Sequence, residues 1–225
     1  MTSNELARHI DHTALKPGTT DAEIRTLCEE AHRFGFAAVC VMPYYIPLAC
    51  AVLEGLGSDV ALCAPVGFPN GLHQTVLKVA ETKKAIHDGA REIDMVLNVG
   101  ALKSGHERVV MADILAVVMA AREGDAIVKV ILETALLSDE EKRLACELAT
   151  RAGADFVKTS TGFGGGGATL DDIRLMRLCS GPNVRVKASG GIRDHATAMA
   201  MIAAGAARIG TSSGMAIMAE HAGIP

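Results

Sequence analysis

Three lysines occupy apolar, strand-like runs of this sequence at equal intervals: Lys129 in IVKVILE, Lys158 in FVKTS and Lys187 in VRVKASG. An unpaired ammonium group is expensive to bury, and lysine is therefore rare in protein interiors. A lysine held close to other cations gives up its proton more readily, and the neutral amine is a nucleophile. Because the interval matches one strand–helix unit, the pattern favours lysines gathered on neighbouring strands for Schiff-base chemistry.

An acidic residue in a fourth strand-like run is the expected proton-transfer partner. Asp94 lies in the middle of EIDMVLN, on the polar face of that segment. A carboxylate beside an imine-forming lysine can move protons directly or through water. A structural interpretation stays open on these residues alone, since the lysines could be buried cations paired with Asp94 and Glu133.

Glycine-rich turns follow the last three strand-like runs and are candidates for phosphate binding. Loops of this kind place backbone N–H groups at helix starts, where an anion is stabilised, and glycine lets the backbone approach it closely. Ordinary turn chemistry is the alternative for any single loop. The residues predicted to bind phosphate are Gly162, Gly190, Gly191, Ser212 and Ser213.

Short apolar runs alternate with helix-like segments along the whole chain, which predicts a parallel sheet. Eight such runs favour a closed (β/α)8 barrel, with a doubly wound open sheet as the alternative. The expected strands are residues 9–13, 37–42, 60–66, 92–98, 127–133, 156–160, 184–189 and 208–211. The expected helices include 21–34, 72–87, 107–121, 139–152, 170–179 and 196–204.

The alternation of side chains within three expected strands favours the barrel. One face of each strand is apolar and would meet the helices, while the other is polar and would point into the barrel, where these faces can meet one another. The charged residues on the polar faces are Glu92, Asp94, Lys129, Glu133, Arg185 and Lys187.

The composition fits one aliphatic domain. The chain has 225 residues, is 49% hydrophobic and only 3% aromatic, and we expect a single domain over residues 1–225 with a disordered AEHAGIP tail. Net charge is −4 with acids and bases interleaved, so no nucleic-acid surface is indicated. No apolar run approaches ~18 residues, which argues against a membrane span.

The N-terminus and the cysteines favour the cytoplasm. MTSNELARHIDH lacks the apolar segment of a signal peptide, and the six cysteines show no CxxC spacing, as is typical of reduced thiols.

Two other motifs are rejected. Gly162, Gly164 and Gly167 fit GxGxxG, but a run of glycines meets that pattern trivially and no acid follows at the required distance. His9 and His12 would lie on opposite faces of a strand, so no metal site is predicted. Cys40 is expected to face the barrel interior with Ala38 and Met42, as small core filling.

The motifs become specific when read in order. The segments IDHTALKP, VCVMPYYIPLA, PVGFPNG, EIDMVLNVGALKSG, VKVILET, DFVKTSTGF, GGATLDDI, VKASGGIR and RIGTSSG run over nearly the whole chain. Together they closely resemble the deoxyribose-phosphate aldolase family, class I aldolases with a (β/α)8 barrel. The resemblance implies reversible cleavage of 2-deoxy-D-ribose 5-phosphate to D-glyceraldehyde 3-phosphate and acetaldehyde, with no metal or other cofactor.

The resemblance also implies roles for individual residues. The lysine of KTSTG falls on Lys158 as the Schiff-base residue, and that of K-x-SGG falls on Lys187, the cation that eases deprotonation of the amine. The aspartate of EIDMV falls on Asp94, in the proton relay, while Lys129 and Cys40 are expected to support the site. The family's phosphate loops fall on the glycines and serines named above. Met42 replaces the Asn that often follows VCV, which puts fine substrate preference in doubt.

The expected partners are a phosphorylated sugar and aldehydes, with a homo-oligomer as the assembly. Two other functions remain open. One is an imine-forming aldolase for another phosphorylated sugar, and the other is a barrel that binds sugar phosphates without catalysis.

Overall fold

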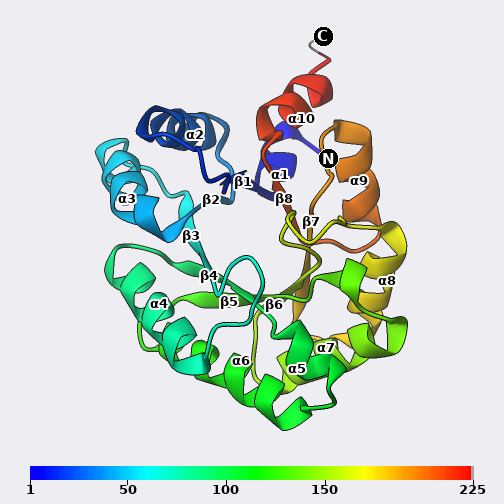
Figure 1. Ribbon diagram of the computed structural model, residues 1–225. Helices are drawn as coiled ribbons and strands as arrows, with labels where there is room; N and C mark the ends of the chain where they lie inside the picture. Colours follow the sequence, from blue (N-terminus) through cyan, green and yellow to red (C-terminus); the bar gives the residue numbers. More distant parts are fainter. Residues whose placement is uncertain (224–225) are drawn as a thin grey trace.

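Eight parallel strands, each hydrogen-bonded to the next, close into a barrel inside a ring of helices (Figure 1). The computed structural model describes residues 1–223. The strands are β1 (Ile10–Ala14), β2 (Ala38–Val41), β3 (Ala61–Val66), β4 (Glu92–Val96), β5 (Ile127–Ile131), β6 (Phe156–Lys158), β7 (Arg185–Ser189) and β8 (Arg208–Thr211). The helices are α1 (Ser3–Ala7), α2 (Asp21–Phe34), α3 (Ile46–Gly55), α4 (Thr75–His87), α5 (Val99–Lys103), α6 (Glu107–Arg122), α7 (Asp139–Arg151), α8 (Leu170–Cys179), α9 (His195–Ala203) and α10 (Gly214–His221), with short 3-10 turns η1 (Pro43–Tyr45) and η2 (Thr134–Leu136).

The first and last strands close the barrel. Ile10 of β1 lies opposite Ile209 of β8, and their pairing confirms the predicted (β/α)8 fold over the open sheet. All eight predicted strands are present, but several end earlier than expected. β4 stops at Val96, because Asn98 turns the chain and its side chain accepts a hydrogen bond from the Ala101 N–H at 2.9 Å to start α5. β5 stops at Ile131, because Glu133 takes a left-handed backbone conformation.

The two faces of the strands divide as the side-chain alternation predicts. Ile93 and Met95 of β4 and Val128 and Val130 of β5 belong to the large aliphatic core between the barrel and the helices. A second, smaller apolar group lies inside the barrel, and its buried members are Leu15, Ala38, Cys40 and Cys63, with Met42 and Phe68 packed against them. The predicted inward orientation of Cys40 with Ala38 and Met42 is confirmed.

The helix starts follow the capping signals in the sequence. Thr20 and Ser138 both form complete capping boxes, and α2 and α8 have the predicted bounds. α4 begins at Thr75 rather than at residue 72, because the preceding segment is a loop with Gly71 at φ 73°. A Cβ on Gly71 would lie 2.0 Å from the Leu97 carbonyl oxygen, so the loop can pass there only as glycine.

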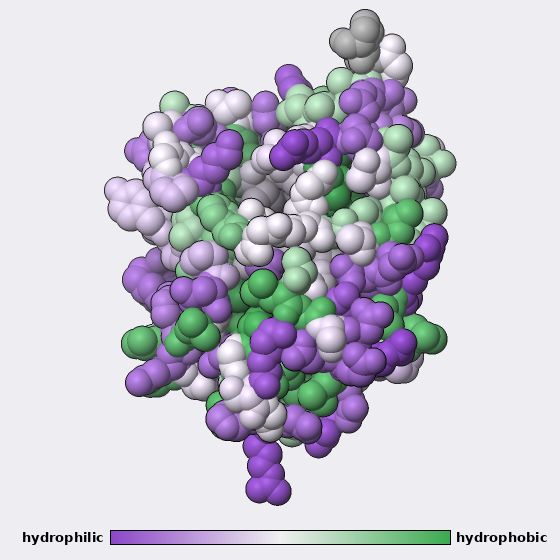
Figure 2. All heavy atoms as spheres, turned by 45° about the vertical axis from the view of Figure 1, so that its right-hand side comes forward, coloured by the Kyte–Doolittle hydropathy of each residue, from purple (hydrophilic) through white to green (hydrophobic). Residues whose placement is uncertain are grey.

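The outer surface carries mixed chemistry. On the face that lies to the right in Figure 1, hydrophilic residues surround smaller groups of hydrophobic ones (Figure 2). Within residues 1–223, no helix is long and apolar enough to cross a membrane. Of the tail expected to be disordered, residues 219–221 belong to α10, and residues 224–225 lie outside the described part.

A buried ion pair joins α4 and α6 to the end of β4. The Lys78 side chain is fully buried, and its Nζ donates to Asp113 Oδ2 at 2.5 Å and to the Val96 carbonyl at 2.9 Å. Removing one partner of such a pair leaves the other as an unpaired buried charge, which is strongly destabilising.

Lys78→Met should therefore lower the free energy of unfolding by roughly 3–5 kcal/mol, measured by chemical denaturation. The matched control is Lys84→Met on the same helix, because Lys84 pairs with Asp88 at the surface and is 69% exposed. The control should leave stability nearly unchanged. Equal effects of the two substitutions would contradict an anchoring role for Lys78.

Candidate active site

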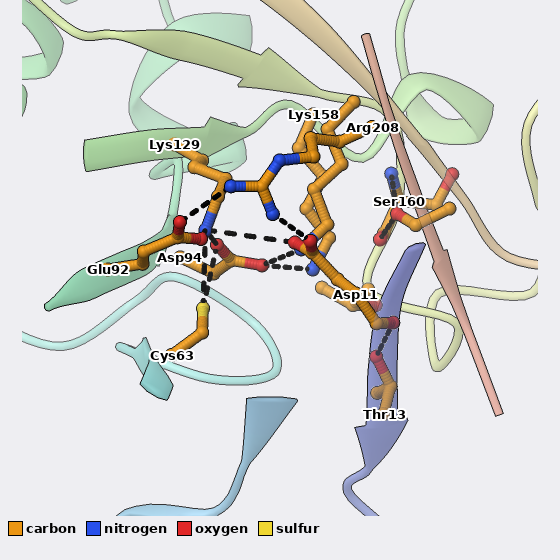
Figure 3. Close-up of polar contacts among 12 residues, drawn as sticks. Asp11, Thr13, Cys63, Glu92, Asp94, Lys129, Lys158, Ser160 and Arg208 are labelled. Carbon is orange, nitrogen blue, oxygen red and sulfur yellow. Dashed lines mark hydrogen bonds and ion pairs between the residues drawn. The ribbon is translucent and has the colours of Figure 1, made fainter. Parts of the chain in front are cut away.

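Lys158 and Lys187 lie side by side in register on β6 and β7. Their Nζ atoms donate to the same oxygen, Asp94 Oδ2, at 2.7 Å and 2.8 Å. Lys129 lies in register with Asp94 on the neighbouring strand and donates to the other oxygen, Oδ1, at 2.8 Å. Figure 3 shows the side chains of Lys129, Lys158 and Asp94 pointing toward one another. The structure thus brings together the three lysines and the aspartate of EIDMV, which the sequence places on four different strands.

Asp94 is fully buried, and the three ammonium groups converge on its carboxylate. Burial by itself would raise its pKa, but the ammonium groups of Lys129, Lys158 and Lys187 outweigh burial and hold the pKa of Asp94 well below its usual range. The Cys63 thiol lies 3.1 Å from Oδ1. Asp94 is therefore a fixed carboxylate, and the structural interpretation that pairs the lysines with it is correct. Within residues 1–223, no lysine forms an ion pair with Glu133, so that half of the structural interpretation is wrong.

Asp11, Glu92 and Arg208 extend the cluster, although the sequence analysis gave none of them a role. Arg208 donates to Asp11 and, at 2.6 Å, to Glu92. Lys187 lies 2.5 Å from Asp11, and Lys129 lies 2.6 Å from Glu92. The available signal was charge in predicted strands: Asp11 is in IDHTALKP, Glu92 opens EIDMV, and Arg208 opens RIGTSSG.

The two deeper lysines are stable cations. Burial would lower the pKa of both. For Lys129 the facing carboxylates, Asp94 first, raise the pKa well above its usual value, and for Lys187 Asp11 and Asp94 raise it. Repulsion between like charges would be expected to depress a lysine pKa. Neither Lys129 nor Lys187 shows this, because each is surrounded by carboxylates as well as by cations.

The cluster contains one more potential cation than it has carboxylates. Its basic groups are Lys129, Lys158, Lys187 and Arg208, and its acids are Asp11, Glu92 and Asp94. Four bases against three acids leave one positive charge in excess when all are ionised. In a dry interior such an excess is costly. Charge balance is reached when one base is a neutral amine.

A cavity of about 760 Å³ opens at the carboxyl ends of the strands, where the active sites of such barrels lie. Of the three lysines, only Lys158 lines this cavity. Its side chain keeps 4% of its surface exposed, while Lys129 and Lys187 are fully buried. Lys158 is therefore the amine that a bound molecule can reach.

The predicted phosphate residues surround the same cavity, with one exception. Gly162, Gly190, Gly191 and Ser212 line it. Ser213 does not, and its N–H donates to Thr211 Oγ1 at 2.9 Å. Two cationic residues that the sequence analysis missed, Lys16 and Arg193, also line the cavity. Their position in loops gave no strand pattern by which to find them.

One group of potential metal ligands occurs among the described residues: Cys40, Cys63 and Asp94, whose donor atoms all lie within 4.8 Å of one another. These residues fit a metal poorly. Asp94 already accepts from three lysines, and Lys129 Nζ lies 3.4 Å from the Cys63 sulfur. A divalent cation would add charge to a cluster that already has a cation in excess. His9 and His12 have separate partners, the Ala207 carbonyl and Glu30.

Comparison with known proteins gives concordant matches. The family described as DeoC/LacD family aldolase matches residues 6–220. The sequence is 57% identical over 216 residues to deoxyribose-phosphate aldolase 1 of Bacillus licheniformis, covering 96% of each chain. It is 55% identical over 218 residues to the deoxyribose-phosphate aldolase of Thermococcus kodakarensis, covering 97% of each chain.

Solved structures agree with the sequence matches. A putative deoxyribose-phosphate aldolase from Coccidioides immitis has a TM-score of 0.94 and 43% identity, covering 99% of this chain and 87% of that one. The deoxyribose phosphate aldolase from Aeropyrum pernix, described as a unique tetrameric structure, has a TM-score of 0.92 and 35% identity, covering 98% of this chain and 92% of that one.

The central position of Asp94 gives a prediction for stability. Asp94→Asn would leave four bases facing only Asp11 and Glu92, and it should lower the free energy of unfolding by roughly 3–5 kcal/mol at neutral pH. Denaturant unfolding would measure the change. The matched control is Asp139→Asn, which removes a surface carboxylate that is 67% exposed and should have little effect.

The stability that Asp94→Asn loses relative to the wild type, called the stability deficit below, should depend on pH with a definite sign. In the wild type, the pKa values of Lys129 and Lys187 are raised above the ordinary lysine value of 10.5. Their ion pairs therefore stabilise the folded state in full at any pH below 10.5. In the Asp94→Asn variant, repulsion makes a buried lysine bind its proton less tightly than in the unfolded chain, so the stability of the variant rises with pH. The deficit should narrow in alkaline buffer. A deficit that widens there would contradict this account.

Proposed function

The chain belongs to the DeoC/LacD family of aldolases, and on that premise we propose that it reversibly cleaves 2-deoxy-D-ribose 5-phosphate to D-glyceraldehyde 3-phosphate and acetaldehyde. We assign the covalent step to a Schiff base on Lys158. The observation that carries this assignment is the accessibility of one lysine among three: Lys158 faces the cavity, while Lys129 and Lys187 are sealed behind it.

The charge balance of the cluster supports Lys158 as the neutral amine. One base of the four must be uncharged for balance, and Lys129, Lys187 and Arg208 all have raised pKa values because of the carboxylates around them. Lys158 contacts one carboxylate, Asp94, which it shares with both other lysines. It is therefore the amine of the three with the fewest carboxylate contacts, and a neutral amine is the form that attacks a carbonyl.

The reaction then follows from the chemistry of an imine. The amine of Lys158 adds to C1 of the open-chain sugar, and loss of water gives an iminium ion. This cation accepts the electron pair of the C2–C3 bond as that bond breaks, while the 3-hydroxyl loses its proton and becomes the aldehyde of glyceraldehyde 3-phosphate. The remaining enamine is protonated at C2, and hydrolysis of the imine releases acetaldehyde and the free lysine.

Asp94 and Lys187 are proposed to serve the proton transfers. Asp94 stays ionised, because its pKa is lowered by the cations, and its Oδ2 stands between the two amines at 2.7 Å and 2.8 Å. A proton that leaves Lys158 can pass along this hydrogen-bonded path. Lys187 supplies a permanent positive charge beside the nucleophile, Lys129 fixes the other oxygen of Asp94, and Cys40 fills the interior below.

The loops that line the cavity are proposed to hold the substrate phosphate. Gly162, Gly190, Gly191 and Ser212 offer backbone and hydroxyl donors, and Arg193 adds a positive charge. Anchoring the phosphate acts on a group remote from the C2–C3 bond and so positions that bond over Lys158. An aldolase acting on another phosphorylated sugar would use the same loops, and comparison of substrates distinguishes the two.

We further propose a cytoplasmic enzyme of deoxyribose phosphate catabolism that acts as a homo-oligomer and binds no nucleic acid. The interleaved charges of the sequence, with a net charge of −4, support the last point. The tetrameric description of the Aeropyrum pernix relative supports self-association.

Borohydride trapping tests the covalent assignment. Incubation with acetaldehyde and sodium borohydride should abolish activity and add a two-carbon adduct to the peptide containing FVKTSTGF, located by mass mapping. The Lys158→Leu variant should neither turn over substrate nor be labelled. An adduct found mainly on Lys187 or Lys129 would overturn the assignment.

Two neighbouring serines test the phosphate site. Ser212→Asp places a negative charge in the cavity and should lower kcat/KM for 2-deoxyribose 5-phosphate by about tenfold or more, with a much smaller loss for 2-deoxyribose. Ser213→Asp is the matched control, because Ser213 does not line the cavity and an aspartate is favourable just before a helix. Equal losses on both substrates would mean that the phosphate binds elsewhere.

A further inference from the structure

Glu133 is a buried carboxylate that the proposed mechanism does not use. It is the second residue after β5, it is 3% exposed, and its backbone is left-handed, with φ 57° and ψ 62°. A non-glycine residue in that conformation carries strain, which persists only where the surrounding structure holds it, and such residues cluster at functional sites. Its position at the carboxyl end of a barrel strand places it at the catalytic face.

The backbone around Glu133 forms a bulge between β5 and the segment after β6. The Leu132 N–H donates to the Lys158 carbonyl at 2.9 Å, and the Thr134 N–H donates to the Thr159 carbonyl at 3.0 Å. Between these two hydrogen bonds the segment after β5 advances by two residues, from Leu132 to Thr134, while its neighbour advances by one, from Lys158 to Thr159. Glu133 is therefore the extra residue. Bulges of this kind redirect a side chain, and here the side chain is turned toward the loop that follows β6.

The carboxylate of Glu133 takes the place of the next acceptor in the ladder. Its Oε2 accepts from the Thr161 N–H at 3.2 Å and from the Thr161 hydroxyl. The Thr161 Oγ1 in turn accepts from the Phe163 N–H at 3.0 Å. Two consecutive turns of the loop therefore depend on one carboxylate. A carboxylate suits this position because it only accepts, and one oxygen can receive both donors.

The same side chain fixes the path of the glycine run. A Cβ on Gly164 would lie 2.5 Å from the Glu133 carboxyl carbon, so the loop passes directly over the carboxylate. At its far end, a Cβ on Gly167 would lie 2.5 Å from the Gly190 carbonyl oxygen, and the Ala168 N–H donates to that oxygen at 3.0 Å. The loop is thus held between Glu133 on one side and the turn after β7 on the other.

The remaining features of Glu133 do not favour stability. Its Oε1 is buried without a hydrogen-bond partner among the described residues, and no lysine or arginine there forms an ion pair with it. An unsatisfied buried acceptor costs stability, as does the left-handed backbone. Both costs fall on the residue that shapes the cavity wall formed by Thr161, Gly162 and Phe163.

We propose that Glu133 is a positioning residue that holds residues 161–167 in the shape that receives the substrate phosphate. It acts through the Thr161 N–H and hydroxyl rather than by touching the substrate. This assignment rests on the proposed function, since it gives a specific support to the phosphate loop of that site.

Two variants of Glu133 separate the role of its side-chain acceptor oxygen from that of its left-handed backbone conformation. Asparagine tolerates a left-handed backbone but is too short to reach Thr161, whereas glutamine keeps both the reach and an acceptor oxygen. We expect Glu133→Asn to raise KM for 2-deoxyribose 5-phosphate about tenfold with a smaller fall in kcat, and to change kcat/KM for 2-deoxyribose much less. Glu133→Gln should stay close to wild type. The control Thr134→Val removes a buried hydroxyl that has no partner and should change neither constant.

Gly164→Ala tests the contact from the loop side. The backbone of Gly164 is not left-handed, and the three atoms nearest to the added methyl group all belong to the Glu133 side chain. This variant should raise KM for the phosphorylated substrate in the same way. The effect should shrink when it is combined with Glu133→Asn, because asparagine lacks the two closest atoms, the carboxyl carbon at 2.5 Å and Oε2 at 2.7 Å. Additive effects in this double-mutant cycle would overturn the proposal, because the two residues would then act independently.

The wild-type enzyme separates this proposal from the proposed function. If wild type does not prefer the phosphorylated sugar, the phosphate site itself is wrong. If wild type prefers it and Glu133→Asn keeps that preference, or loses activity equally on both sugars, then Glu133 does not position the phosphate loop and the present inference fails. Melting temperatures measured in parallel identify a variant that is merely unfolded.

Discussion

The burial of ammonium groups around a single carboxylate is the constraint on which the rest of this structure depends. Asp94 has no access to water and accepts from Lys129, Lys158 and Lys187. Charges of this kind are stable in an interior only when each is paired at close range. The outer ring of Asp11, Glu92 and Arg208 completes that pairing, so the strands that carry these residues must meet with their registers fixed.

A closed barrel meets this requirement because its strands surround one interior. Lys158 and Lys187 are in register on adjacent strands, and Asp11 on β1 reaches Lys187 only because β1 pairs with β8. In an open sheet, the first and last strands would lie at opposite edges. Closure is therefore a condition for the electrostatics of the site, and the aliphatic core outside the barrel stabilises the closed form.

The proposed catalytic and binding groups are carried by different elements. The proposed reacting groups, Lys158, Lys187 and Asp94, stand on strands, where backbone hydrogen bonds on both sides hold them rigidly. The proposed phosphate donors stand on loops after β6, β7 and β8, where glycine allows the backbone to approach an anion. Glu133 links the two, because its backbone lies just after β5 while its carboxylate holds the loop after β6. A small distortion at one strand end thereby gives a flexible segment a defined shape.

The barrel, its eight strands and the convergence of Lys158, Lys187 and Asp94 are predictable from the amino-acid pattern, because alternation with period two and the position of a residue within a strand are local properties. The same pattern also marks the helix starts at Thr20 and Ser138, where capping is encoded within four residues. The predicted strands 92–98 and 127–133 are each two residues too long, because β4 ends at Val96 and β5 at Ile131. The residues that follow leave the barrel but still continue the alternating pattern.

Which lysine faces the cavity depends on the folded molecule, because the exposure of each amine is set by the residues that the other strands place in front of it. The tertiary structure alone brought Asp11, Glu92 and Arg208 into one cluster, placed Ser212 but not Ser213 in the cavity wall, and revealed the bulge at Glu133. These features arise from contacts between segments far apart in the chain, and no pattern within a single segment carries that information.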